Sequence, residues 1–330
     1  MHVLAAPDKF RGTASAAEVA AAIGRAARRA GHTVDEVPLA DGGEGILDVL
    51  GGPNRTTVVA GPLGDPVVAP WRFAEGTAVI EMARASGLVL AGGAEGNDPM
   101  AASTTGTGEL IAAALDAGAR RIVVGVGGSA STDGGLGAIR ALAPLHRLRG
   151  VELVVACDVH TRFVDAAEVF APQKGASRPQ VALLRRRLER LVQVYRSDHG
   201  IDVADLDGAG AAGGLAGGLA AVGARLVGGF DLVADEVGLV DRIDGADLVV
   251  TGEGFVDAQS FDGKVVGGVV ALARRAGVPV LVVCGEAFDE LPSGLEVVSL
   301  VAEVGADRAF GDTVASIERL MARRIGGRAG

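Results

Sequence analysis

The stretch with the clearest chemical character is 121–137, RIVVGVGGSASTDGGLG, in which an apolar β-branched run leads into a loop of glycines and hydroxyl side chains. Gly127 and Gly128 leave backbone N–H groups uncovered and Ser129 adds a hydroxyl, so the loop is suited to bind an anion such as a phosphate. Asp133 lies within this loop, where a carboxylate can hold Mg²⁺ against a phosphate or accept a proton from a hydroxyl. A plain strand-to-helix turn is an equally good interpretation of the loop on its own.

Charged residues also follow several other apolar runs. They are Asp8, Lys9 and Arg11 after residues 2–6, Asp41, Gly42, Gly43 and Glu44 after residues 33–39, Asp158 after residues 151–156, and Glu253, Gln259 and Lys264 after residues 248–250. Ligands of open α/β sheets bind just beyond the carboxyl ends of the strands, so these residues are candidates for a shared site. Such a site would hold the donors, cations and carboxylates that phosphoryl transfer requires, whereas isolated surface charges are the alternative for each cluster.

Two further turns carry polar side chains that suit a phosphate. Residues 102–108, ASTTGTG, place Ser103, Thr104 and Thr107 before an expected helix over 109–117, where they can bind an anion or cap the helix. Lys174 lies in a polar turn over 171–176 and is a candidate for neutralising a transferred phosphoryl group.

Other signatures of catalysis or binding are weak. There is no P-loop motif, and the match of residues 125–130 to a dinucleotide-binding motif lacks its acidic partner, since Glu152 begins an expected strand. The histidines and the two cysteines, Cys157 and Cys284, have no metal-binding spacing. A net charge of −10 argues against a nucleic-acid partner. The basic run at 185–190 is interleaved with leucines at helical spacing and is interpreted as a solvated helix face.

The elements that must position these residues follow an α/β pattern. At 330 residues the chain favours two domains. Buried strands followed by helices, with a capping box at Ser15 and Glu18 before a helix over 16–30, predict βαβ units. Short strand-like runs with Gly-Pro turns over 54–82 predict antiparallel hairpins in a different domain. We therefore expect a discontinuous Rossmann-like α/β domain with a mainly parallel sheet, and an inserted second α/β domain with the active site in the cleft between them. The first is expected to comprise residues 1–57, 104–140 and 238–330, and the second residues 58–103 and 141–237.

The chain shows no clear targeting or membrane segment. Its beginning, MHVLAAPDKF, enters an expected strand at once, and the longest run without charges, 208–224, is too rich in glycine and alanine for a convincing membrane span. Each cysteine lies in an apolar run and is interpreted as a buried small side chain of a reduced protein. These features predict a cytoplasmic protein without a membrane partner.

Nine motifs, in order along the chain, resemble those of the bacterial type 1 glycerate kinase family. They are APDKFRGTASA, PLADGGEG, GPLGDPV, ASTTGTGEL, VGGSASTDGG, ACDV, FAPQKGA, GAGAAGGL and TGEGFVDAQSFDGK. The resemblance implies a two-domain α/β enzyme of organic acid metabolism that transfers the γ-phosphate of ATP to D-glycerate, with Mg²⁺. It implies 2-phosphoglycerate as the product ahead of 3-phosphoglycerate, with no nucleic-acid or membrane partner, and a homodimer is an assembly that it allows.

Given this resemblance, the charge and placement of the candidate residues predict their roles. The residues expected to bind glycerate are Asp8, Lys9, Arg11, Asp41, Gly42, Gly43 and Glu44. The residues expected to hold the phosphates are Ser103, Thr104, Thr107, Gly127, Gly128, Ser129, Lys174, Gln259 and Lys264. The residues expected to take part in catalysis are Asp8, Lys9, Asp133, Asp158 and Glu253. Asp133 and Glu253 are the candidate Mg²⁺ ligands, and the sequence does not rank the carboxylates as general base. If Asp133 serves the transition state, its replacement by Asn is expected to lower phosphorylation by ~10² or more.

Several motif positions depart from the family pattern. Four single residues differ from the type that is common in the family: Arg11 stands in place of Lys, Thr105 in place of an aromatic residue, Thr132 in place of Asn and Phe255 in place of Arg. Residues 160–163 replace an Asn-Pro turn, and the segment 142–148 is shorter than in relatives. The loss of a cation at Phe255 bears on phosphate contacts at that loop. Two other functions therefore stay open. An NAD-dependent hydroxy-acid oxidoreductase would change nicotinamide absorbance without releasing ADP, and a non-catalytic metabolite-binding protein would bind glycerate without forming ADP.

Overall fold

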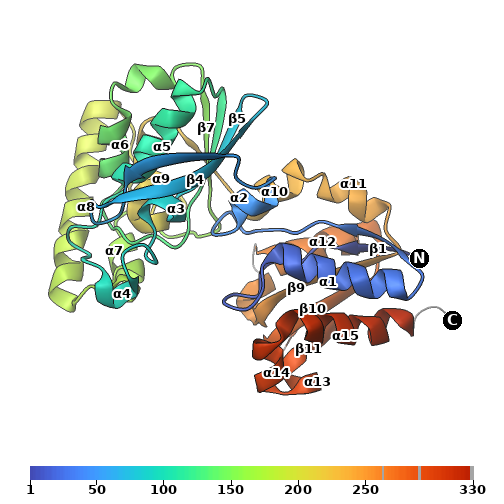
Figure 1. Ribbon diagram of the computed structural model, residues 1–330. Helices are drawn as coiled ribbons and strands as arrows, with labels where there is room; N and C mark the ends of the chain where they lie inside the picture. The colour runs from blue at the N-terminus through green and yellow to red at the C-terminus, as the bar shows by residue number, and fades with distance from the viewer. Residues whose placement is uncertain (262–263, 289–290, 328–330) are drawn as a thin grey trace. The chain divides into compact units, whose positions relative to one another are not determined.

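The computed structural model describes residues 1–261, 264–288 and 291–327. Its contacts divide the chain into two compact units (Figure 1), of which unit 1 contains residues 1–41 and 230–330 and unit 2 contains residues 42–229. Each unit is built on its own sheet, and most strand pairs are parallel. This confirms the predicted α/β fold class with mainly parallel sheets.

Unit 1 has a five-stranded sheet in the order β11-β10-β9-β1-β2, and all of its strand pairs are parallel. Its strands are β1 (His2–Ala5), β2 (Thr33–Glu36), β9 (Leu248–Val256), β10 (Val280–Ala287) and β11 (Glu296–Ser299). Its helices in the described residues are α1 (Ala16–Arg29), α10 (Gly229–Glu236), α11 (Leu239–Asp244), the 3₁₀ helix η3 (Ala258–Phe261), α12 (Val265–Ala276), α13 (Leu300–Val304), α14 (Ala306–Gly311) and α15 (Thr313–Gly326).

Helices cover both faces of the unit 1 sheet. Leu281 and Val283 of β10 belong to the core formed with α1 and α15, whereas Val282 and Cys284 belong to the core formed with α12. Successive side chains of a strand point to opposite faces, so α1 and α15, which lie side by side in Figure 1, are on one face and α12 is on the other. The carboxyl ends of the strands are left for loops, which carry the candidate residues.

The first helix begins where the sequence predicts. Ser15 caps α1 by accepting a hydrogen bond from the Glu18 N–H at 3.3 Å, and the Glu18 carboxylate accepts one from the Ser15 N–H at 2.9 Å. This reciprocal pair is the predicted capping box, and it fixes where the chain turns from the β1 loop into α1.

Unit 2 has a six-stranded sheet in the order β3-β4-β5-β6-β7-β8. Its strands are β3 (Arg55–Ala60), β4 (Pro66–Ala74), β5 (Thr77–Glu81), β6 (Arg121–Gly125), β7 (Glu152–Ala156) and β8 (Arg225–Val227). The pairs β3-β4 and β4-β5 are antiparallel, and the pairs from β5 to β8 are parallel. The predicted hairpins over 54–82 are therefore confirmed.

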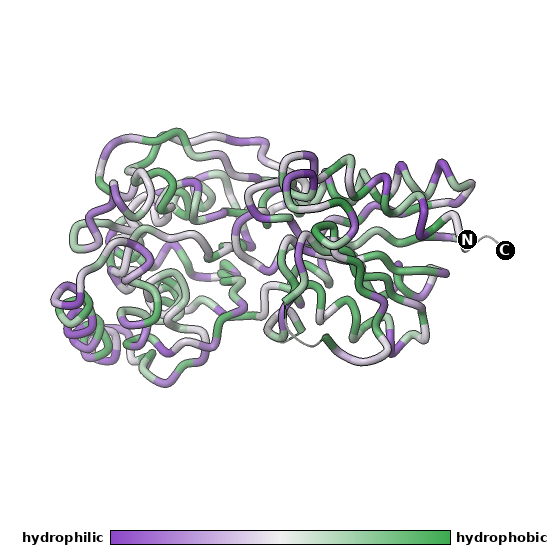
Figure 2. Tube along the Cα trace, turned by 90° about the horizontal axis from the view of Figure 1, so that it is seen from below, coloured by the Kyte–Doolittle hydropathy of each residue, from purple (hydrophilic) through white to green (hydrophobic). Residues whose placement is uncertain are grey.

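The helices of unit 2 pack around this sheet and around a second core that is formed mainly by helices. They are α2 (Ile46–Val49), α3 (Ala83–Ser86), α4 (Gly93–Gly96), α5 (Thr105–Asp116), α6 (Leu136–Leu142), η1 (Leu145–Leu148), α7 (Ala166–Phe170), η2 (Pro172–Lys174), α8 (Arg178–His199) and α9 (Ala211–Ala221). α5, α6 and α9 contribute to the core of the sheet, and α7 and α8 pack in a core with Phe163 and Tyr195. α8, seen end-on at the left of Figure 2, carries both hydrophobic and hydrophilic residues, and Leu184, Leu188 and Leu191 are buried at the spacing of one helix face, as in an amphipathic helix.

The assignment of residues 104–140 to the first domain is wrong. β6 lies in the middle of the unit 2 sheet, between β5 and β7, and α5 packs on β3, β4 and β5 of that sheet. The units change at 41/42 and 229/230 instead of near 57 and 238. An apolar run such as 122–124 is buried in either sheet, so the local pattern does not tell which strands it pairs with.

The glycine-dense stretch 207–218 includes a helix that packs very closely on the loop after β6. A Cβ atom on Gly218 of α9 would lie 2.4 Å from the Gly134 carbonyl oxygen, and one on Gly213 would lie 2.1 Å from the Ser131 carbonyl oxygen. Only glycine permits this approach, so α9 forms a floor for the loop that carries Ser129 and Asp133.

Candidate active site

Two of the predicted carboxylates, Asp8 and Glu253, belong to neighbouring strands of unit 1. Asp8 follows β1, whereas Glu253 lies within β9, which continues to Val256 beyond the predicted end at residue 250. β1 pairs with β9 in parallel, and the pairing continues beyond β1, where the Asp8 N–H donates to the Gly252 carbonyl oxygen at 2.8 Å. A Cβ atom on Gly252 would lie 1.8 Å from the Val283 carbonyl oxygen, so only glycine fits there. The backbone therefore fixes Asp8 beside the strand that carries Glu253.

Asp8 is almost buried, with 7% of its surface exposed, and this burial raises the pKa of its carboxyl to about 6. Lys9, Arg11 and the Lys9 N–H, which donates to Asp8 Oδ1 at 2.6 Å, lower the pKa, whereas the charge of Asp41 raises it. Lys9 Nζ lies 3.9 Å from Asp41 Oδ1. Unit 1 thus brings together four of the residues predicted for the glycerate end.

Burial also raises the pKa of the Glu253 carboxyl, to about 7. A hydrogen bond from Ser260 and the charge of Lys264 lower this pKa, and the charges of Asp8 and Asp41 raise it. Glu253 Oε1 is buried and has no hydrogen-bond partner. A desolvated carboxylate oxygen without a partner is typical of a position that binds a ligand or a proton.

In unit 2 the glycine-rich loop after β6 is supported by Lys174. This lysine is 2% exposed, and its Nζ donates to Ser129 Oγ at 2.7 Å and to the Ser131 carbonyl oxygen at 2.6 Å. Burial lowers the pKa of the ammonium to about 7, and the charge of Asp133 acts in the opposite direction. Lys174 therefore holds the loop in shape, and its predicted contact with a phosphate stays a prediction.

Asp133 uses both of its carboxylate oxygens within unit 2. Oδ2 accepts hydrogen bonds from the Thr104 N–H at 2.9 Å, the Thr104 hydroxyl at 2.8 Å and the Gly137 N–H at 3.2 Å. Oδ1 accepts one from the Gly135 N–H at 3.1 Å. These bonds tie the first turn of α6 to the residue before α5, so the geometry favours a structural role for Asp133 over metal binding or proton transfer.

The other hydroxyls predicted to hold phosphates are also bonded within unit 2. Ser103 Oγ and Thr105 Oγ1 share a hydrogen bond of 2.8 Å, and the buried Thr107 Oγ1 shares one of 2.9 Å with Ser86 Oγ. The predicted start of this helix at residue 109 is wrong, because α5 begins at Thr105 and takes in the hydroxyl-rich turn. The hydroxyls stabilise the beginning of α5 and its contact with α3.

The predicted site glycines allow close contact between backbones. A Cβ atom on Gly127 would lie 2.9 Å from Gly43 Cα, and one on Gly42 would lie 2.7 Å from Gly229 Cα. Gly128 has a φ of +64°, which favours glycine. Packing accounts for these glycines, and their contact with a ligand stays a prediction.

The remaining predicted residues lie at separate places. Asp158 follows β7 in unit 2, and its Oδ1 accepts a hydrogen bond from the Gly229 N–H at 2.6 Å. Glu44 is exposed and belongs to unit 2, whereas Asp41 belongs to unit 1. Lys264 precedes α12 in unit 1, and the side chain of Gln259 lies outside the described part of the structure.

The residues of unit 1 fit a divalent cation better than Asp133 does. Within the described residues there is no group of three or more His, Cys, Asp or Glu side chains arranged to hold a metal ion. Mg²⁺, however, commonly takes one or two carboxylates together with phosphate oxygens and water. Glu253 has an unpartnered oxygen and two carboxylate neighbours, Asp8 and Asp41, so an added cation would relieve their repulsion.

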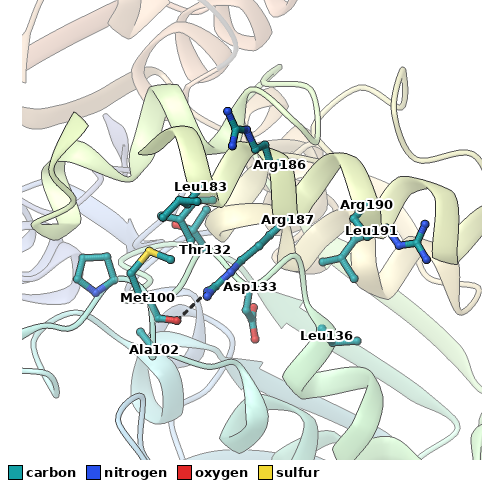
Figure 3. Close-up of a pocket in the computed structure, with 12 residues that line it drawn as sticks. Met100, Ala102, Thr132, Asp133, Leu136, Leu183, Arg186, Arg187, Arg190 and Leu191 are labelled. Carbon is teal, nitrogen blue, oxygen red and sulfur yellow. Dashed lines mark hydrogen bonds between the residues drawn. The ribbon is translucent and has the colours of Figure 1, made fainter. Parts of the chain in front are cut away.

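The basic run of α8 is the feature that sequence reasoning missed. Arg186, Arg187 and Arg190 are exposed, as predicted, but they line a pocket with Thr132 and Asp133 (Figure 3). Their spacing of three and four residues indicates a shared helix face. The opposite wall comes from residues 99–102, far away in the sequence, so the spacing alone could not reveal the pocket.

The structure also bears on the competing dinucleotide motif. Glu152 begins β7, as predicted, and its carboxylate lies 3.1 Å from Arg225 Nη2 and 3.4 Å from Arg121 Nε. It does not end a strand, where the acidic partner of a dinucleotide motif is expected. Phe255, which replaces the family's Arg, is 46% exposed and stacks on Phe288 and Phe310.

Both cysteines are unpaired and buried, as predicted. No helix among the described residues is long and apolar enough to cross a membrane.

The sequence model of the Glycerate kinase family matches residues 3–145 and 143–323 of the chain. The two matches meet at the end of α6, in the segment that is shorter than expected for the family. Together they cover all of the motifs described above, in both units.

Similar proteins agree with this match. The chain is 45% identical over 301 residues to an uncharacterised protein of Mycobacterium tuberculosis, which covers 87% of this chain and 79% of that protein. It is 37% identical over 350 residues to the Glycerate 2-kinase of Escherichia coli, with 94% of this chain and 90% of the other covered. A crystal structure assigned as glycerate kinase 2 from Salmonella typhimurium matches with a TM-score of 0.83 at 34% identity, covering 99% of this chain and 97% of that one. The chain therefore belongs to the glycerate kinase family.

Proposed function

We propose that this protein transfers the γ-phosphate of ATP to the 2-hydroxyl of D-glycerate, giving 2-phosphoglycerate and ADP in organic acid metabolism. Membership of the glycerate kinase family supports the kinase activity, and the name of the Escherichia coli relative, Glycerate 2-kinase, supports the position of the phosphate. The single observation that carries the site is the pair of desolvated carboxyls, Asp8 and Glu253, with the cations Lys9, Arg11 and Lys264 around them.

The acceptor side of the reaction is assigned to unit 1. Lys9 and Arg11 bind the glycerate carboxylate, since charge-assisted hydrogen bonds to carboxylates are short and strong. Asp8 accepts the proton of the 2-hydroxyl as its oxygen forms a bond to the γ-phosphorus and the bond from that phosphorus to the bridging oxygen of ADP breaks. A pKa of about 6 leaves Asp8 ionised at neutral pH and more basic than an exposed Asp, as suits a general base.

Glu253, with Asp41 beside it, would hold Mg²⁺, for which the unpartnered Oε1 is the main support. When bound, Mg²⁺ supplies positive charge to the oxygens of the transferred phosphoryl group. Lys264 adds a further positive charge close to Glu253, whose pKa it lowers.

The donor side is assigned to unit 2. The loop around Gly127, Gly128 and Ser129 offers backbone N–H groups to phosphates, and Lys174 and Asp133 keep that loop in shape through their hydrogen bonds. The expected cleft between the two domains stays part of this proposal, as do a cytoplasmic location and a homodimer.

The proposal is tested by measuring ADP release in a coupled assay with D-glycerate, L-glycerate and related hydroxy acids, with and without a chelator of Mg²⁺. We expect release only with D-glycerate and Mg²⁺, and a product whose NMR spectrum places the phosphate on carbon 2. A phosphate on carbon 3 would correct the position. Glycerate binding without ADP, or a nicotinamide absorbance change without ADP, would replace the proposal by one of the competing functions.

A further inference from the structure

The pocket beside α8 belongs to unit 2 alone. It has a volume of about 540 Å³ and lies between α8, residues 99–102 and the end of the glycine-rich loop. Figure 3 shows Arg187 reaching from α8 to the Met100 backbone, with Thr132 and Leu183 on the same side. Ligand pockets in proteins have volumes of roughly 300–1,000 Å³, so this one has the size of a binding site.

The pocket carries positive charge that the chain does not neutralise. Arg185, which directly precedes Arg186, forms ion pairs with Asp165, Glu168 and Glu189. None of the ion pairs of the described residues involves Arg186, Arg187 or Arg190. Arg187 donates one hydrogen bond, of 2.9 Å, to the Met100 carbonyl oxygen, which leaves most of its five N–H groups for another partner.

A buried hydroxyl at the pocket wall also has no partner. Thr132 is 2% exposed, and its Oγ1 has no hydrogen bond. Burial of an unpaired hydroxyl costs about 1–3 kcal/mol, so such groups are rare unless a ligand uses them. The neighbouring acid, Asp133, accepts hydrogen bonds from backbone N–H groups and forms no ion pair with these arginines, of which Arg190 donates a hydrogen bond of 3.1 Å to Gln193 Oε1.

We propose that this pocket binds the nucleoside part of the donor nucleotide and part of its phosphate chain, next to the phosphates assigned above to the loop of Gly127, Gly128 and Ser129. The lining is mostly apolar, with Met100 and Leu183 beside the arginines, and this combination suits a flat base joined to a polyanion. Guanidinium groups both stack on aromatic rings and bind phosphates through paired hydrogen bonds. A three-carbon acid has too little apolar surface to match such walls. The inference rests on the proposed kinase function, of which it locates the donor.

The test uses calorimetric titration of the full chain with ADP, and the KM values for ATP and D-glycerate. The double variant Arg187→Gln/Arg190→Gln is expected to bind ADP ~10–100-fold more weakly, because charge-assisted hydrogen bonds are lost. Arg178→Gln is the matched control, since Arg178 is an exposed arginine of the same helix outside the pocket. Its Kd for ADP is expected to stay within about twofold of the unaltered protein, since it makes no such bond. The KM for D-glycerate should change in neither variant.

Thr132→Val gives a second, independent readout. Removing an unpartnered buried hydroxyl is expected to leave the melting temperature unchanged or to raise it, while weakening ADP binding about fivefold or more. If Thr132→Val lowered the melting temperature as well as the affinity for ADP, the hydroxyl would serve the fold, and its part in the site would be overturned.

The outcomes separate this inference from the proposed function. Unchanged ADP affinity and KM for ATP in the arginine variant, with normal glycerate phosphorylation, would overturn the pocket and leave the kinase standing. If the unaltered protein bound ADP but did not phosphorylate glycerate, and the arginine variant lost ADP binding, the pocket would be supported and the kinase function overturned. Tripolyphosphate binding as tightly as ADP would overturn the assignment of the base to this pocket.

Discussion

In unit 1 the Asp8 and Glu253 carboxyls have raised pKa values and Glu253 Oε1 has no partner, whereas in unit 2 the Asp133 carboxylate accepts four hydrogen bonds. All three are acidic residues of family motifs: Asp8 follows β1, Asp133 follows β6 and Glu253 lies within β9. Glu253 thus keeps one oxygen that a ligand could bind, whereas both oxygens of Asp133 stabilise the shape of a loop. The surroundings therefore differ between the units, and we predict a chemical role for the unit 1 pair and a structural role for Asp133.

The largest expected effect is that of Asp8→Asn on turnover. Loss of a general base lowers the rate by roughly 10²–10⁴-fold, and the change removes a desolvated charge, so the melting temperature is expected to stay the same or to rise. Turnover from ADP release and the melting temperature from calorimetry are compared with the unaltered protein. A loss of activity that follows a loss of stability would place Asp8 with the architectural acids.

Asp133→Asn is the matched substitution in unit 2 and should show the opposite pattern. An amide cannot accept all four hydrogen bonds, and unpaired buried N–H groups cost about 1–3 kcal/mol each, so the melting temperature is expected to fall by several degrees. The turnover of the folded protein is expected to fall by less than about tenfold, because other groups carry the chemistry. A loss of ~10² or more without loss of stability would restore the catalytic role predicted from the sequence.

Gly218→Ala tests whether the floor of the unit 2 loop depends on close packing. The new Cβ would lie 2.4 Å from the Gly134 carbonyl oxygen, and overpacking of this kind costs about 1–3 kcal/mol of unfolding free energy. Gly311→Ala is the control, because a Cβ there meets nothing within 4 Å. Denaturant unfolding measures the unfolding free energy of both variants. Equal losses in the two would show that the loop does not depend on close packing against Gly218.

The pH dependence of stability tests the support of the loop by Lys174. Burial lowers the pKa of Lys174 from 10.5 to about 7, so the unfolded chain binds more protons than the folded one between these values. The unfolding free energy should therefore rise with pH in this window, by up to ~1.4 kcal/mol per unit, relative to Lys174→Met. A constant difference between the two proteins from pH 7 to 10 would contradict the burial of this ammonium.

The sequence predicts the local elements of both units well, because the signals are local. The capping box of α1 and the hairpins of β3 to β5 follow from neighbouring residues. The sheet to which β6 belongs does not, because partner strands are chosen by long-range packing. This is why the predicted domain boundaries are wrong, although the strand itself is correct.

The candidate site divides in the same way. Positions after strands predict that four residues lie close together, and the structure brings them together in unit 1: Asp8, Lys9, Arg11 and Asp41. The sequence could not show that both oxygens of Asp133 accept hydrogen bonds, since the donors are residues 104, 135 and 137 at the beginnings of two helices. Nor could it show the pocket beside α8, whose walls are more than 80 residues apart in the chain.

The most direct test of the account is the rate of D-glycerate-dependent ADP release by the unaltered protein, Asp8→Asn and Asp133→Asn, measured where all three are folded. We expect turnover by the unaltered protein, a turnover rate lowered by ~10³ in Asp8→Asn, and a rate lowered by less than about tenfold in Asp133→Asn. Equal losses in the two variants, or ADP release that does not depend on D-glycerate, would contradict it.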